Sequence, residues 1–208
     1  SAPAIRDGEV YIQDRIEQKQ DVLRCLDANT GKELWNFTYD APGDVSHDGP
    51  RMVPTVDEKY VYSVGMLGHF FCLDRKTHKP VWQKNLCDDY KVKVPGWGCV
   101  QTPVLYKDLV IVAPQGKKAY IAAYKRDTGE TVWETPSLGL VGYVSPALTK
   151  LGGVEQLVMI GACPKGKTEP GEVAGISLED GKVLWSYKGW RCFIPIPFPV
   201  TLPDDRLF

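Results

Sequence analysis

The sequence predicts an all-β fold built from four-stranded antiparallel sheets that repeat along the chain, and three observations support this. An eleven-residue element ending in tryptophan recurs at intervals of 47, 51 and 52 residues, at Trp35, Trp82, Trp133 and Trp185. Between these tryptophans, short β-branched and aromatic runs alternate with turn residues. No segment shows the apolar spacing of an amphipathic helix over several turns, so we expect essentially no helix. A repeat of this period indicates a β-propeller, in which each blade packs only on its neighbours.

The second repeat shows the four expected strands of one blade. A first strand over residues 53–56 carries Pro54 near its start, where a missing N–H is tolerated. The next strands are expected over residues 60–64, 69–74 and 81–84, separated by turn-forming segments. Four short strands in about fifty residues are the content of one propeller blade.

The other repeats fit the same frame. The first strands of repeats three and four are expected over residues 102–105 and 145–148, and a fifth repeat is expected to begin with a strand over residues 198–201. We therefore treat residues 1–208 as one partial propeller, with blades over approximately 1–43, 44–95, 96–139 and 140–191 and the start of a further blade over 192–208.

Each repeated element places a turn before its tryptophan. Gly31, Gly129 and Gly181 stand where a tight turn needs positive φ, whereas the second repeat has His78 at this position. An indole ring offers a large apolar face and one N–H donor, so we expect the four tryptophans to be structural and to pack between blades.

The element resembles the tryptophan-docking motif of the quinoprotein alcohol dehydrogenase-like β-propellers, also known as PQQ-binding-like repeats. The first copy, from Cys25 to Trp35, is nearest to the consensus, and the copies at His78 and at 179–181 depart from it. The resemblance covers essentially the whole chain. It implies about four blades and the start of a fifth within a larger propeller of about seven or eight blades. It also implies a location in the bacterial periplasm or cell envelope.

Composition limits the classes of partner. The formal net charge of −1 gives no electrostatic footprint for nucleic acid, and no apolar run has the length of a membrane span. The six cysteines form no CxxC motif and indicate no metal site. Cys25 and Cys72 are expected to be small buried hydrophobes, while Cys87 with Cys99 and Cys163 with Cys192 could pair in an oxidising compartment.

The loops that enter the innermost strands are expected to converge on one mouth of the propeller channel. They carry an imidazole, a carboxylate, guanidinium groups, two indoles and a phenol. The residues are His47, Asp48, Arg51, Arg191, Trp97, Trp190 and Tyr143. Such groups suit a flat anionic ligand held by stacking, cation–π contacts and an arginine fork. A structural interpretation stays open, in which Arg51 bonds Asp44 or Asp48 and Trp97 fills the channel.

Two functions from different classes follow. The first is a non-catalytic binding or assembly scaffold with protein partners or the remainder of the propeller, which resembles the lipoprotein propeller of the outer-membrane β-barrel assembly machinery. The second is a PQQ-dependent alcohol or sugar dehydrogenase. The resemblance then implies PQQ and Ca²⁺ as cofactors, Asp48 as the candidate base and Arg51 as a quinone contact. The residues themselves demonstrate no cofactor site.

Overall fold

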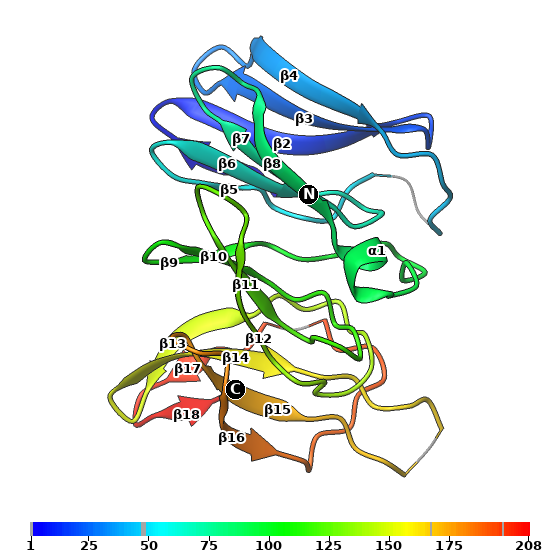
Figure 1. Cartoon of the computed structure of the whole chain (residues 1–208), viewed down its shortest axis with the longest axis vertical. Coiled ribbons are helices and arrows are strands. Elements are labelled where there is room, and N and C mark those ends of the chain that lie inside the picture. The colour runs from blue at the N-terminus through cyan, green and yellow to red at the C-terminus, as the bar shows by residue number, and fades with distance from the viewer. Residues whose placement is uncertain (1, 47–48, 167, 197) are drawn as a thin grey trace. The chain divides into compact units, whose positions relative to one another are not determined.

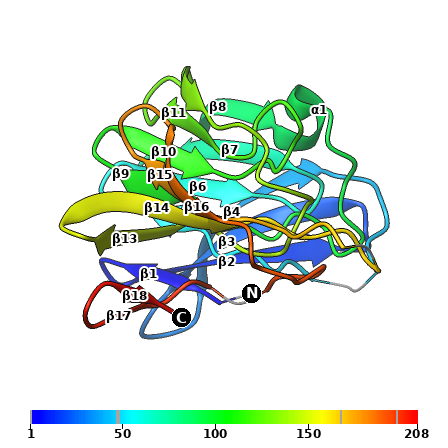
Figure 2. The same ribbon diagram turned by 90° about the horizontal axis from the view of Figure 1, so that it is seen from below.

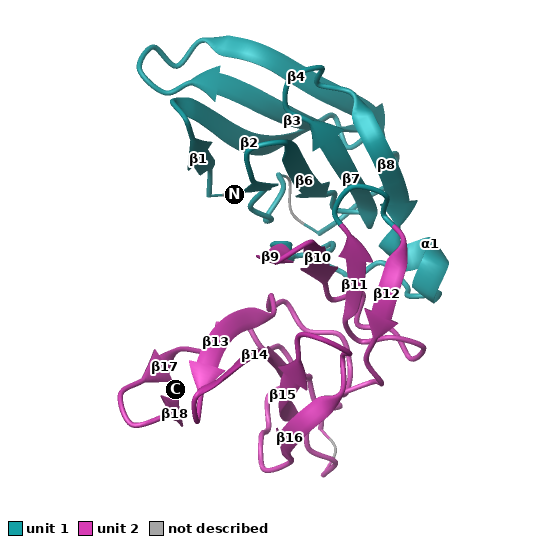
Figure 3. Cartoon of the chain, turned by 60° about the vertical axis from the view of Figure 1, so that its left-hand side comes forward, with its two compact units in different colours: residues 1–103, 126–129 teal, residues 104–125, 130–208 magenta. Residues whose placement is uncertain are grey.

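The computed structural model describes residues 2–46, 49–166, 168–196 and 198–208. These residues form two compact units (Figure 3). Unit 1 contains residues 1–103 and 126–129, and unit 2 contains residues 104–125 and 130–208. The turn of the third repeat therefore belongs to unit 1, while the strands on either side of it belong to unit 2.

Unit 1 contains two four-stranded antiparallel sheets, each formed by consecutive strands (Figure 1). The first consists of β1 (Ala4–Arg6), β2 (Glu9–Ile16), β3 (Gln20–Asp27) and β4 (Glu33–Asp40). The second consists of β5 (Thr55–Val56), β6 (Tyr60–Val64), β7 (His69–Asp74) and β8 (Pro80–Asn85).

Unit 2 repeats this arrangement with two further sheets. The first consists of β9 (Val104–Tyr106), β10 (Leu109–Val112), β11 (Ala122–Lys125) and β12 (Thr131–Glu134). The second consists of β13 (Ala147–Leu151), β14 (Val154–Ile160), β15 (Val173–Ser177) and β16 (Val183–Tyr187). A two-stranded sheet of β17 (Thr201–Leu202) and β18 (Arg206–Leu207) lies beside β13 (Figure 2). The predicted all-β class and the four-stranded repeat are confirmed.

The first strand of each four-stranded sheet begins directly after a proline. β1, β5, β9 and β13 follow Pro3, Pro54, Pro103 and Pro146. The first strands predicted over 53–56, 102–105 and 145–148 included Pro54, Pro103 and Pro146 and are therefore too long at their starts, because proline has no N–H to give to a ladder. The strand predicted over 198–201 is displaced similarly and shares only Thr201 with β17.

One short helix, α1 (Leu86–Tyr90), follows β8. The side chain of Asn85 caps it by accepting hydrogen bonds from the backbone N–H groups of Cys87 and Asp88. It ends at Lys91, which has the left-handed conformation with φ 54°. Five residues are too few for an apolar period to appear, so the sequence pattern missed this element although its cap is standard.

The core lies between neighbouring sheets in each unit. In unit 1, Leu23 and Cys25 of β3 pack with Phe71 and Leu73 of β7. In unit 2, the core combines side chains from β10, β11, β14 and β15 with Tyr120 and Ile121. Its fully buried members on these strands include Ile111, Ala123, Leu157, Met159 and Ile176. Cys25 and Cys72 are also fully buried, which confirms the expected role of both thiols as small hydrophobes.

Candidate functional site

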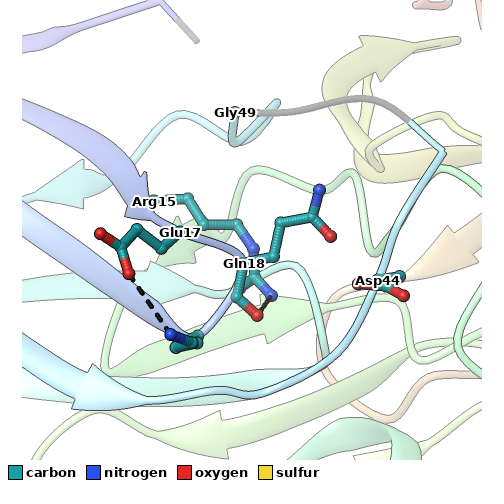
Figure 4. A pocket seen from close by; sticks show the side chains of 6 residues that line it. Arg15, Glu17, Gln18, Asp44 and Gly49 are labelled. Atoms are coloured by element: carbon teal, nitrogen blue, oxygen red, sulfur yellow. Dashed lines mark hydrogen bonds and ion pairs between the residues drawn. The ribbon is translucent and has the colours of Figure 1, made fainter.

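A polar pocket of about 560 Å³ opens on unit 1 beside the turn between β2 and β3 (Figure 4). Arg15, near the end of β2, lines the pocket with Glu17, Gln18 and Lys19 of the turn. The segment that follows β4 supplies Asp44 and Gly49. Glu17 and Gln18 both adopt positive φ, at 48° and 54°, which makes the turn tight. The exposed side chains of Glu17 and Lys19 form an ion pair of 3.4 Å.

The guanidinium of Arg15 forms one wall of this pocket, and its side chain is only 2% exposed. Nη1 donates to Oδ1 of Asp21 at 2.5 Å. Nη2 donates to the carbonyl oxygens of Gln18, Ala41 and Gly43 at 3.1, 2.9 and 2.6 Å. Arg15 thus fastens the chain that leaves β4 to the β2–β3 turn and shapes the pocket.

The Asp21 carboxylate is the centre of a buried polar network. Besides Arg15, it accepts a hydrogen bond from the backbone N–H of Met66 at 3.2 Å and one from the Tyr39 hydroxyl at 3.3 Å. Burial raises the pKa of Tyr39 well above its usual range, and the neighbouring Asp21 charge acts in the same direction. The phenol therefore stays a donor at neutral pH, and the buried carboxylate is fully compensated.

Two further polar side chains lie at the same end of the two sheets. The ring of His69 lies 5.2 Å from the Tyr39 ring, and burial lowers the pKa of His69. Gln13 donates to the Val64 carbonyl at 3.1 Å and to the Ser63 hydroxyl. Among the described residues, His69 Nδ1 and Gln13 Oε1 are buried without a hydrogen-bond partner. This cluster contains no nucleophile beside a base, so we assign it no reaction.

The structure brings together two of the residues predicted for the channel mouth. Arg51 Nη1 donates to the carbonyl oxygen of Trp97 at 2.7 Å, and both residues are half-buried in unit 1. Tyr143 and Arg191 belong to unit 2, where Tyr143 is half-buried and Arg191 is exposed. His47 and Asp48 lie outside the described residues. A common site for all of these residues stays a prediction.

No three His, Cys, Asp or Glu side chains within the described ranges converge as metal ligands. Calcium is bound by several oxygens, usually with carboxylates among them. We therefore assign no calcium site to these residues and derive no step through a quinone. In the described part of the chain, no helix is long and apolar enough to cross a bilayer.

The repeated tryptophans contact the turn of the repeat that follows. Trp82 Nε1 donates to the carbonyl of Arg126 at 3.0 Å, and Trp133 Nε1 donates to the carbonyl of Leu178 at 3.1 Å. A Cβ atom placed on Gly129 would lie 2.7 Å from the Trp82 ring, and one on Gly181 would lie 2.5 Å from the Trp133 ring. Both glycines thus allow the indole to lie directly against the turn backbone.

The first and last tryptophans have different surroundings. Trp35 stacks on the imidazole of His78 at 4.5 Å with 14° between the rings, and His78 adopts the glycine-like φ of 61°. Trp185 donates to Gln156 Oε1 of its own sheet at 2.6 Å. A Cβ on Gly31 would meet no atom within 4 Å. The docking role of all four tryptophans stays a prediction, which these contacts support.

Two arginines, each seven residues before a tryptophan, reach back to the preceding sheet. Arg75 donates to the Tyr11 hydroxyl, Asp7 and Glu9 at 3.0, 3.0 and 2.8 Å. Arg126 pairs with the buried Asp57 carboxylate and donates to the Tyr62 hydroxyl at 3.3 Å. These bridges were not predicted from the sequence, although the shared spacing of Arg75 before Trp82 and of Arg126 before Trp133 was a signal.

A protein-family model described as outer membrane protein assembly factor BamB matches residues 18–189. The chain belongs to this family. Its four-stranded antiparallel sheets are therefore those of a PQQ-like propeller repeat protein, as the resemblance implied.

The similar proteins include a quinoprotein dehydrogenase and BamB. The chain is 29% identical over 154 residues to quinoprotein alcohol dehydrogenase PedH of Pseudomonas putida, covering 68% of this chain and 24% of PedH. BamB from Moraxella catarrhalis is a similar solved structure, with a TM-score of 0.56 and 20% identity over 90% of this chain and 51% of that one.

A europium-containing methanol dehydrogenase has a TM-score of 0.59 and 16% identity, covering 89% of this chain and 41% of that one. The chain thus spans about half of the BamB structure and about a quarter of PedH. These structural likenesses show the propeller fold.

Proposed function

We propose that this chain is a non-catalytic binding or assembly scaffold of the bacterial cell envelope. The observation that carries the proposal is the long outer strand β4, whose second edge pairs with no other strand in the described ranges. The family description, an outer membrane protein assembly factor, supports the same class of function and the same compartment.

The two faces of β4 differ in a way that suits strand addition. Its inward side chains pack on the second sheet, with the Phe37 and Tyr39 rings 5.0 and 4.6 Å from the Phe71 ring. Its remaining side chains are exposed; they are Glu33, Leu34, Asn36, Thr38 and Asp40. Packing holds the eight-residue strand in place, so its free backbone edge offers a template for an extended segment of a partner protein.

The outer strands also expose a repeated apolar side chain. The residue before each repeated tryptophan is 52, 42, 43 and 47% exposed, at Leu34, Val81, Val132 and Leu184. These side chains give each outer strand an apolar contact beside its open edge. A partner with alternating apolar residues would bury them while its backbone extends the sheet.

Substitution of the edge tests the scaffold proposal. Leu34→Lys and Thr38→Lys place charges on β4, and Lys on an edge opposes pairing with another chain. Val154→Lys on β14 is the matched control, because Val154 is comparably exposed at 51% and both edges of β14 are paired within its own sheet. We expect chemical cross-linking in a bacterial envelope extract to give defined products with the wild type and the control, and to lose them in the β4 variants. Equal cross-linking by all four proteins would contradict the proposal.

The alternative function is a PQQ-dependent alcohol or sugar dehydrogenase. It is favoured by the similarity to PedH and by the contact between Arg51 and Trp97. In that case the Trp97 indole would stack on the quinone and the Arg51 guanidinium would face its carboxylates. The quinone would supply the redox chemistry.

Reconstitution with PQQ and Ca²⁺ separates the two functions. The scaffold proposal predicts no quinone absorbance in the protein fraction after gel filtration and no dye-linked alcohol oxidation. Retained absorbance that Arg51→Gln abolishes, together with alcohol oxidation, would establish the dehydrogenase instead.

A further inference from the structure

Two thiols of unit 1 lie in contact beside the loop that carries Trp97. The Sγ atoms of Cys87 and Cys99 are 3.6 Å apart, and both residues are buried at 7% exposure. For the other sequence-predicted pair, Cys163 and Cys192, the contact is a backbone hydrogen bond from the Cys163 N–H to the Cys192 carbonyl at 2.9 Å. Of the two pairings that the sequence left open, the structure thus brings the sulfur atoms of Cys87 and Cys99 together.

Both backbones are fixed close to the sulfur contact. Cys87 is the second residue of α1, and its N–H donates to the Asn85 side chain at 3.0 Å. The Cys99 N–H donates to the Met66 carbonyl at 2.8 Å. A Cβ on Gly68 would lie 2.7 Å from the Cys87 sulfur, so only glycine leaves room for this thiol. Forming an S–S bond of about 2.0 Å would bring the two sulfur atoms closer by about 1.6 Å.

We propose that Cys87 and Cys99 form an intramolecular disulfide that braces the Trp97 loop. Three contacts place this loop at a junction of unit 1. The Trp97 carbonyl accepts from Arg51, the Gly96 carbonyl accepts from the Ser46 N–H at 3.1 Å, and Cys99 is bonded to Met66. A cross-link at Cys99 ties all three contacts to the end of β8.

The reaction is thiol–disulfide exchange with an external dialkyl disulfide or a disulfide oxidoreductase. The hydrogen bond from Cys99 lowers the pKa of Cys87, which favours Cys87 as the first nucleophile. Its thiolate attacks one sulfur of the external disulfide, which forms a mixed disulfide and releases one thiol. The Cys99 thiolate then attacks the Cys87 sulfur and releases the second thiol. The two cysteines are oxidised, the external disulfide is reduced, and both protons pass to its thiols.

Peptide mapping tests this bond directly. Cleavage after Lys84, Lys91, Lys93 and Lys107 separates the two cysteines, with Cys87 in residues 85–91 and Cys99 in residues 94–107. After equilibration with oxidised glutathione and blocking of free thiols, we expect these two peptides to be joined and lighter by two hydrogens than their sum. Cys192→Ser is the matched control and should keep this product. Absence of the joined peptide, or a link from either cysteine to another one, would overturn the proposal.

A thermal readout tests the brace. We expect oxidation to raise the Tm by on the order of 5–10 °C, because it closes a short loop in the unfolded chain. Cys87→Ser, Cys99→Ser and the double variant should each abolish this shift to the same extent. The joined peptide could form while neither the Tm nor the hydrogen exchange of the Gly96 to Cys99 amides changes. That result would show a disulfide without a bracing role and would contradict this half of the proposal. None of these results depends on whether the chain is a scaffold or a dehydrogenase.

Discussion

Trp82 of unit 1 and Trp133 of unit 2 contact the following turn in a similar way, but the groups around them differ in polarity. In unit 1, Arg126 accompanies Trp82 and pairs with the buried Asp57 carboxylate of the preceding sheet. In unit 2, the residue at the equivalent position is Leu178, which is buried against the Trp133 ring. One repeat motif therefore holds the tryptophan's strand to the following turn either with an accompanying ion pair or with apolar packing alone.

This difference separates what the motif requires from what varies around it. The indole, its N–H donated to a turn carbonyl, and the glycine beneath the ring occur in both units. The charged bridge occurs only where the position seven residues before the tryptophan is arginine, at Arg75 and Arg126. We infer that the indole supplies most of the packing free energy, while the Arg75 and Arg126 bridges add a stabilisation that depends on the charges of the paired groups.

The largest expected effect is that of Trp133→Ala. This ring is 7% exposed and lies in the core of unit 2, so its removal should lower the free energy of unfolding by about 3–5 kcal/mol. Urea unfolding followed by circular dichroism would measure the change. An unchanged unfolding midpoint would refute the packing role of this tryptophan.

The next effect is that of Gly181→Ala. The added methyl group would overlap the Trp133 ring and also occupy a backbone with φ 69°, which together should lower stability by about 2–4 kcal/mol. Gly31→Ala is the matched control, because Gly31 has nearly the same φ, at 70°, but open space around it. If both variants lost equal stability, the close approach of ring and turn would have no energetic role.

A smaller effect is expected from Arg126→Met, which removes the bridge of unit 1 and leaves the buried Asp57 without its charged partner. The loss should be roughly 1.5–3 kcal/mol, the range for hydrogen bonds to charged groups. Lys182→Met is the control, since Lys182 and Asp180 form an exposed ion pair of 2.6 Å in unit 2. A smaller loss of stability is expected there, because solvent screens an ion pair between exposed side chains. Equal losses of unfolding free energy for Arg126→Met and Lys182→Met would contradict the expected role of the Arg126 bridge.

The smallest expected effect is a pH dependence of the folding stability that comes from the bridge between Arg75 and Glu9. Burial opposes ionisation of Glu9, but hydrogen bonds from Arg75 and Tyr11 outweigh it and hold the pKa of Glu9 below its ordinary value of 4.5. Because this pKa is lower in the folded state, its stabilisation is present above about pH 4.5 and is lost as the pH falls through the folded pKa. The wild type should therefore lose more stability in acid than Glu9→Gln, by up to about 1 kcal/mol. Parallel pH–stability curves for the two proteins would argue against this bridge.

The fold was predictable because its signals are local and periodic. The spacing of the four tryptophans, the glycine turns and the short β-branched runs are all visible within single repeats. The strand starts were misplaced for a reason that is also local, since each first strand begins after its proline instead of including it. Helix α1 escaped because five residues show no period.

The candidate site was much less predictable because its contacts join distant parts of the chain. The carbonyls that Arg15 binds at Ala41 and Gly43 are 26 and 28 residues away, and no sequence pattern links these positions. Arg51 and Trp97 were both chosen from loop chemistry, and their hydrogen bond spans 46 residues. Loop residues reveal their chemical type in sequence, but only the folded sheets determine which of them meet.

A double-mutant cycle between Trp133 and Gly181 tests most directly the claim that an indole seated on the next turn joins consecutive sheets. Once Trp133→Ala has removed the ring, Gly181→Ala should retain only its backbone penalty. The two losses of unfolding free energy should therefore be non-additive by about 1–3 kcal/mol. Additive losses, with Gly181→Ala equally destabilising in both backgrounds, would contradict the account.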